Sequence, residues 1–187
     1  MQLQSTWEGT QIMFNNLQFR KLIIQPVLKA LMLNGSDIED LLVGTCAQES
    51  RGGTFLFQEG TNPDLYASLQ KNILAIGPYQ MQPATHDDIW ENYLPSHPNL
   101  LECLIEICAI PPQLCLPQKK PPANFMLYNL YYATAMARIH YRRVPEPVPS
   151  TLELQAEYYK KYYNTSGGKA TIDEYITNYN NFVGTKK

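Results

Sequence analysis

The sequence predicts a mainly α-helical protein that folds as one domain, with about seven helices and one irregular loop or small β insertion. Three observations predict this class. Apolar residues recur every three or four positions over most of the chain, and three S/T-x-x-E capping boxes mark helix starts. A length of 187 residues is enough for one domain with a full hydrophobic core and too short for two domains of ordinary size. We therefore expect residues 1–187 to form a single domain.

The N-terminal part of the chain predicts two helices. Helical spacing of apolar residues covers 17–33, where a following Asn-Gly pair ends the helix and Pro26 predicts a kink. The capping box at Ser36 then begins a second helix, which two glycines end. Glu49 falls on the same face of this helix as Leu41, so we expect its carboxylate to face inward.

The remaining elements follow an irregular region. Residues 51–84 are rich in Gly, Asn, Pro and Asp, and they predict a loop with a short hairpin or helical turns. Thr85 is expected to cap a short helix, 99–110 is a further apolar helix, and 125–143 is the longest helical pattern. Two more capping boxes begin at Ser150 and Thr171, and their helices run to about Tyr163 and Phe182.

Composition excludes several classes of function. The formal net charge is −2 and the pI is near 5.9, which argues against nucleic acid as a partner. The N-terminus shows neither a basic region nor an apolar stretch typical of a signal peptide, and no run is long enough to span a bilayer. We expect a chain made in the cytoplasm without a membrane span. The cysteine spacing does not suggest a zinc site, and we expect neither metal nor cofactor.

The stretch GTCAQESRGG, residues 44–53, places Glu49 in the last turn of a helix. Burial and the negative end of a helix both disfavour an ionised carboxylate and raise its pKa, as a general acid near neutral pH requires. The alternative is a structural glutamate that pairs with Arg51 or a tyrosine hydroxyl. His86, His97 and His140 have no triad partner at a suggestive spacing, and we assign them no catalytic role.

A second stretch, AIGPYQMQPAT at 75–85, fits the register A-x-G-x-x-Q-x-x-P-x-T. It follows Glu49-Ser50 and precedes the pair Tyr163-Asn164. In this order, the elements resemble the lysozyme-like superfamily, specifically the soluble lytic transglycosylases and the related goose-type lysozymes. The resemblance covers about residues 36–182 and implies a lysozyme-like fold.

The resemblance also implies roles for individual residues. Glu49 would be the catalytic general acid and base. Gln80 would line the groove near the cleaved bond, and Tyr163 with Asn164 would hold Glu49 and the sugar. Tyr79 would also bind substrate, and Ser50 would support the site. The chain departs from the family pattern in a longer separation between Glu49 and Gln80, in Tyr79 where Met is common, and in YNTSGG in place of Y-N-A-G. These departures concern sugar subsites more than the catalytic role.

The reaction implied is that of a lytic transglycosylase, which cleaves the β-1,4 bond between N-acetylmuramic acid and N-acetylglucosamine with one carboxylic acid. The partner would be the glycan strands of peptidoglycan. A hydrolytic lysozyme is one alternative, and its second carboxylate would be Glu59, Asp64, Asp87 or Asp88. Without a signal peptide, such an enzyme suits a bacteriophage, acting at the cell wall as a virion component or a holin-released lysin. The other alternative is a virion structural protein with this fold and no activity, and a virion setting would bring other virion proteins as partners.

Overall fold

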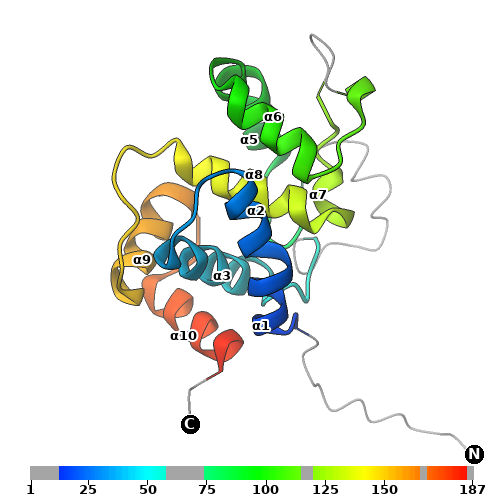
Figure 1. Cartoon of the computed structure of the whole chain (residues 1–187). Coiled ribbons are helices and arrows are strands. Elements are labelled where there is room, and N and C mark those ends of the chain that lie inside the picture. The colour runs from blue at the N-terminus through cyan, green and yellow to red at the C-terminus, as the bar shows by residue number, and fades with distance from the viewer. Residues whose placement is uncertain (1–12, 58–73, 115–119, 165–167, 185–187) are drawn as a thin grey trace, which may run out of the picture.

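A computed structural model describes residues 13–57, 74–114, 120–164 and 168–184, and regular structure within these ranges is helical (Figure 1). Isolated antiparallel bridges join Ile76 to Phe57 and to Met81, and these ranges contain no β-strand. The predicted mainly α class is confirmed. The described ends of the irregular region after residue 50 form turns and isolated bridges, and residues 58–73 of the predicted loop lie outside the described ranges.

The first helical stretch is continuous but changes its winding. Its segments are α1 Asn16–Gln18, a π-helical turn Phe19–Ile24 and α2 Gln25–Ala30. Pro26 was expected to kink the helix, since proline has no N–H and its ring crowds the carbonyl four residues earlier. The winding changes just before the proline, where the N–H of Gln25 bonds the carbonyl of Arg20, five residues back. The helix ends at Ala30, and Met32 then adopts the left-handed conformation with φ of 55°, before the Asn-Gly pair expected to end it.

Several helix starts differ from the predicted caps. Helix α3 Ser36–Ser50 begins as expected, but its N-cap is Gly35 and no side chain caps it. Helix α5 Pro83–Asp88 begins two residues before Thr85, because Pro is well suited to the first turn, where its missing N–H leaves no bond unmade. Helix α9 Leu152–Tyr159 is capped by Thr151 in place of Ser150.

Helix α10 Ile172–Val183 confirms the last capping box. The hydroxyl of Thr171 accepts from the N–H of Glu174, and the carboxylate of Glu174 accepts from the N–H of Thr171. Both partners lie within one turn, so the sequence alone specifies the contact.

The middle of the chain supplies shorter helices than expected. They are α5, a π-helical turn Ile89–Tyr93, a 3-10 turn Leu94–Ser96, α6 Pro98–Ile107, α7 Phe125–Tyr128 and α8 Leu130–Arg142. The helix predicted over 125–143 is divided at Asn129. The side chain of Asn129 caps α8 by accepting from the N–H of Tyr132 at 2.9 Å, and it donates to the carbonyl of Cys108 at 2.9 Å.

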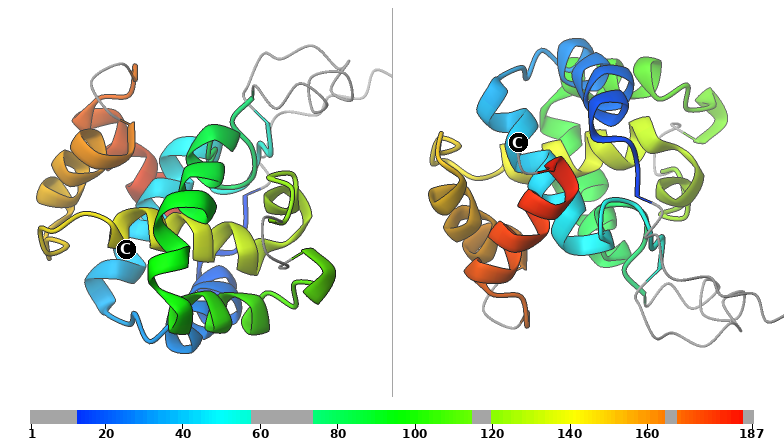
Figure 2. Two further views of the ribbon diagram at one scale, coloured as in Figure 1. Left: turned by 90° about the horizontal axis from the view of Figure 1, so that it is seen from above. Right: turned by 90° about the horizontal axis from the view of Figure 1, so that it is seen from below.

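Helices α3 and α8 lie at the centre of the arrangement (Figures 1 and 2). Helix α3 packs against α8, α9 and α10, and α8 packs also against α2, α6 and α7. Their facing side chains are fully buried, and they include Leu42 on α3 and Ile139 on α8. The end of α3, which carries Glu49, is thus held by neighbours on several sides.

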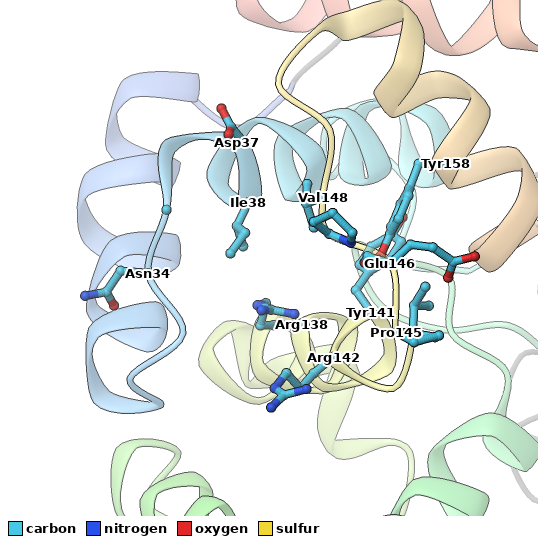
Figure 3. Close-up of a pocket in the computed structure, with 13 residues that line it drawn as sticks. Asn34, Asp37, Ile38, Arg138, Tyr141, Arg142, Pro145, Glu146, Val148 and Tyr158 are labelled. Atoms are coloured by element: carbon cyan, nitrogen blue, oxygen red, sulfur yellow. The ribbon is translucent and has the colours of Figure 1, made fainter.

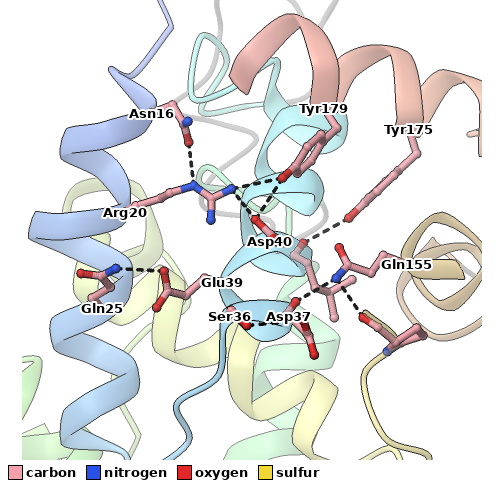
Figure 4. Close-up of polar contacts among 12 residues, drawn as sticks. Asn16, Arg20, Gln25, Ser36, Asp37, Glu39, Asp40, Gln155, Tyr175 and Tyr179 are labelled. Atoms are coloured by element: carbon pink, nitrogen blue, oxygen red, sulfur yellow. Dashed lines mark hydrogen bonds and ion pairs between the residues drawn. The ribbon is translucent and has the colours of Figure 1, made fainter. Parts of the chain in front are cut away.

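A polar cluster links the N-terminal helix, α3 and α10 (Figure 4). The guanidinium of Arg20 lies 2.6 Å from the carboxylate of Asp40, which also accepts from the hydroxyl of Tyr179 at 3.0 Å. The hydroxyl of Tyr175 donates to the carbonyl of Leu41 at 3.3 Å. The ion pair is partly exposed and contributes little free energy, on the order of 1 kcal/mol or less. Its directional bonds instead help to fix α10 against α3.

Candidate active site

A cleft of about 850 Å³ opens beside the C-terminal end of α3. Four of the six residues expected from the sequence line it: Glu49, Gln80, Tyr163 and Asn164. They come from α3, from the turn after residue 76 and from the segment that follows α9. The predicted site residues, far apart in the sequence, therefore meet at one surface of a cavity large enough for a sugar unit.

Glu49 sits in the last turn of α3, with its side chain half-buried at the cleft wall. The helix stops directly after it, because Arg51 adopts the left-handed conformation with φ of 50° and two positive-φ glycines follow. Burial raises the pKa of the Glu49 carboxyl to about 7, and a hydrogen bond from Tyr159 opposes that rise. A carboxylic acid with this pKa can deliver a proton near neutral pH.

Tyr159 is a site residue that the sequence reasoning missed. Its hydroxyl donates to Oε1 of Glu49 at 2.5 Å, the contact that we expected from Tyr163. Tyr163 instead donates to the carbonyl of Tyr79 at 2.7 Å, and its ring stacks on that of Tyr159 with centroids 6.0 Å apart. The two tyrosines lie one turn apart and share a face, and only the packing of α9 on α3 decides which one reaches Glu49.

Replacing Tyr159 by Phe is expected to shift the pH dependence of activity. The hydroxyl lowers the pKa of Glu49, so its loss raises that pKa and keeps the acid protonated to higher pH. If the protein cleaves peptidoglycan as the sequence resemblance implies, the alkaline limb of the pH–rate profile for peptidoglycan clearing should therefore move to higher pH. Tyr158→Phe is the matched control, because the hydroxyl of Tyr158 donates to the carbonyl of Glu146, away from the cleft. An alkaline limb at the parent's pH in Tyr159→Phe would contradict this role.

Gln80 presents an unpaired acceptor at the cleft. Its backbone is left-handed with φ of 44°, and its Nε2 donates to the carbonyl of Gly77 at 2.9 Å. This bond fixes the amide, so that Oε1 is buried and has no hydrogen-bond partner within the described residues. A buried acceptor without a donor is unusual, and a ligand N–H or O–H would satisfy it.

Ser50 and Tyr79 lie behind the cleft and do not line it. Each side chain is about 1% exposed. The hydroxyl of Ser50 donates to the carbonyl of Pro78 at 2.6 Å and accepts from the N–H of Gly53 at 2.9 Å. The phenol of Tyr79 shares a hydrogen bond of 3.3 Å with Thr134. The burial of Tyr79 does not allow the substrate contact expected of it. Ser50 holds the turn of Gln80 against the end of α3, and Tyr79 holds it against α8.

His140 and Asn164 also line the cleft. His140, which we assigned no catalytic role, lines the cleft, and its Nε2 bonds the carbonyl of Tyr162 at 3.2 Å. Its Nδ1 is buried without a partner among the described residues, and burial lowers the pKa of the ring to about 4. His140 is therefore neutral at pH 7 and offers a second acceptor. Asn164 is held at the cleft by Lys160, whose ammonium donates to its side-chain oxygen at 2.8 Å.

Glu49 is the single carboxylate among the described residues that line the cleft. Asp87 lies 2.8 Å from His86 and 3.2 Å from Lys120, and Asp88 pairs with Arg143, so both have partners elsewhere. Glu59 and Asp64, the other candidates for a second carboxylate, lie outside the described residues. Across the described ranges, no group of three His, Cys, Asp or Glu side chains is placed to hold a metal ion.

Comparison with known proteins gives no match for this chain, whether with family models, curated proteins or solved structures. Among the described helices, none combines the length and apolar character needed to cross a membrane. The function is therefore inferred from the residues that line the cleft, above all Glu49.

Proposed function

We propose that this protein is a peptidoglycan lytic transglycosylase with a lysozyme-like fold, in which Glu49 is the catalytic acid and base. The observation that carries the proposal is a half-buried carboxyl with a pKa of about 7 at the wall of a cleft of about 850 Å³. The family resemblance supports it, because Glu49, Gln80, Tyr163 and Asn164 come from separate motifs and line the same cleft.

The proposed reaction uses Glu49 twice, first as an acid and then as a base. Protonated Glu49 gives its proton to the oxygen that links N-acetylmuramic acid to N-acetylglucosamine, and the bond from that oxygen to the muramoyl C1 breaks. The muramoyl N-acetyl group assists by stabilising the positive charge at C1. The carboxylate of Glu49 then takes the proton of the muramoyl 6-hydroxyl, whose oxygen bonds C1. The product is a 1,6-anhydro sugar, no water is consumed, and Glu49 is protonated again.

The remaining polar groups of the cleft suit the binding of an N-acetylated sugar. The side chains of Gln80, His140 and Asn164 bring polar groups to the cleft wall, where they can bond the amide and the hydroxyls of the glycan. The phenol of Tyr159 keeps Glu49 in position through its 2.5 Å bond. The setting that we propose is a bacteriophage enzyme that meets the glycan strands at the bacterial cell wall.

The products of digestion test this proposal. With one carboxylate, water has no general base, whereas the attached 6-hydroxyl has an effective concentration on the order of 10⁵ M or more when well oriented. Mass spectrometry of digested peptidoglycan should show muropeptides lighter by one water than those from a lysozyme. Reducing ends would identify a hydrolase whose second carboxylate is Glu59 or Asp64. An absence of soluble fragments would overturn the enzymatic proposal and favour a structural protein.

A further inference from the structure

A second pocket, of about 450 Å³, lies between the start of α3, the end of α8, the connector 144–148 and α9 (Figure 3). It shares no lining residue with the cleft of Glu49. Its lining includes two arginines of α8, Arg138 and Arg142, one helical turn apart. The pocket is thus a separate feature of the molecule, independent of the proposed enzymatic function.

Arg138 is buried, and the described part of the chain places no carboxylate in an ion pair with it. The residue is only 6% exposed, and its Nε has no hydrogen-bond partner within the described ranges. By contrast, Arg20 pairs with Asp40 and Arg143 pairs with Asp88. A buried cation that lacks an opposite charge destabilises a fold, so such a residue calls for a reason beyond packing.

Arg142 adds a second positive charge to the same pocket. Figure 3 shows both arginine side chains of α8 at one end of the pocket. Burial lowers the pKa of the Arg138 guanidinium, and the charge of Arg142 lowers it further. The two like charges therefore repel one another as well as being unpaired.

The acidic residues around the pocket do not neutralise this pair. The carboxylate of Asp37 points away from the two guanidinium groups in Figure 3. Glu146 lies at the other end of the pocket and pairs with Lys161, 3.4 Å away. The end of the pocket formed by α8 keeps an uncompensated charge.

We propose that this pocket binds a phosphate group, with Arg138 as the buried contact and Arg142 as the second. Guanidinium groups match phosphate oxygens in geometry, and a phosphate monoester carries about −1.5 to −2 charges near pH 7, which balances two arginines. The neighbouring wall, with Ile38, Tyr158 and Val148, suits the carbon skeleton of a monoester. A bound phosphate would pair the part of the Arg138 guanidinium that lines the pocket and offset the repulsion from Arg142.

Calorimetric titration of the full chain with three probes at constant ionic strength tests the site. Inorganic phosphate and phenyl phosphate should bind, and acetate, with one charge, should bind more weakly than either. Tighter binding of phenyl phosphate would identify a monoester as the ligand, and equal affinity would identify free phosphate. Binding of acetate as strong as that of phosphate, or no binding of either phosphate probe, would overturn the proposal.

Variants locate the binding within the pocket. Arg142→Gln changes an exposed side chain and should weaken phosphate binding by about tenfold, the loss expected for one charge-assisted hydrogen bond. Arg143→Gln is the matched control, because Arg143 pairs with Asp88 outside the pocket, and the affinity of this variant should equal the parent's. Equal losses in these two variants would mean a general charge effect and would overturn the site.

Arg138→Met separates binding from folding. Methionine fills a similar volume without a charge, so phosphate binding should disappear while the melting temperature in phosphate-free buffer stays equal or rises. A purely structural arginine would give the opposite stability result. An Arg138→Met protein that binds phosphate like the parent would contradict the proposal, and the pair of variants at 142 and 143 decides the matter if this variant does not fold.

Discussion

Replacing Glu49 by Gln is expected to abolish the clearing of peptidoglycan, with a rate loss on the order of 10³-fold or more. The amide keeps the volume of the carboxyl and can still accept the hydrogen bond from Tyr159, so the cleft should keep its shape. It cannot give up a proton to the glycosidic oxygen. A zymogram with purified peptidoglycan measures the loss, and clearing at the parent's rate would show that another group is the acid.

The pH dependence of the free energy of unfolding shows whether the Glu49→Gln variant is folded. The pKa of Glu49 is about 7 in the fold against an ordinary value of 4.5, so between these values the folded state binds more protons than the unfolded state. The parent therefore loses stability as the pH rises from about 4.5 to about 7, by up to about 3 kcal/mol. The amide in Glu49→Gln does not titrate, and melting curves should show the variant to be the more stable protein above pH 7.

A carboxylate elsewhere on the same helix supplies the matched control. Glu39 lies in the first turn of α3, where Oε2 accepts from the side chain of Gln25 at 3.0 Å, far from the cleft. Glu39→Gln removes one carboxylate and should leave clearing unchanged. Equal losses in the two variants would point to the overall charge of the protein in place of the acid at position 49.

Local signals in the sequence predicted the fold where both partners of a contact are close in the chain. The capping box of Thr171 and Glu174 formed as expected, because its two bonds lie within one turn. The same signature at Ser36 and Ser150 did not form its cap. There the incoming chain sets the backbone angles, and a neighbouring residue became the N-cap. The division of the long helix at Asn129 combines a local cap, the bond from the N–H of Tyr132, with a bond to the carbonyl of Cys108 that no local pattern contains.

The candidate site shows the same division between local and long-range information. The position of Glu49 at an inward-facing helix end follows from the spacing in α3 and from the glycines after it. Gln80, Tyr163 and Asn164 line the cleft as the motifs suggested. The hydroxyl that bonds Glu49 was assigned to the wrong tyrosine, because Tyr159 and Tyr163 share a face and only the packing of α9 on α3 distinguishes them.

The close approach of α10 to α3 depends on Gly44. An ideal Cβ at this buried residue would lie 2.0 Å from the hydroxyl oxygen of Tyr175 and 2.4 Å from its ring, inside any allowed contact. The ring of Tyr175 packs against that of Tyr159, with centroids 4.9 Å apart, and Tyr159 in turn bonds Glu49. The hydrogen side chain of Gly44 thus supports both the packing of two helices and the position of the Glu49 carboxyl.

Gly44→Ala is therefore expected to destabilise the protein by about 3 kcal/mol or more, the upper range for overpacking of a core. In an exposed helix position the same change would stabilise by about 1 kcal/mol, because alanine has the higher helix propensity, so the sign alone tests the contact. Ser36→Ala, in the exposed first turn of the same helix, is the control and should change the free energy of unfolding by about 0.5 kcal/mol or less. Urea unfolding followed by circular dichroism gives both values. A Gly44→Ala protein as stable as the parent would show that α10 does not pack on α3 at this residue, and the route by which Tyr175 and Tyr159 position Glu49 would fail with it.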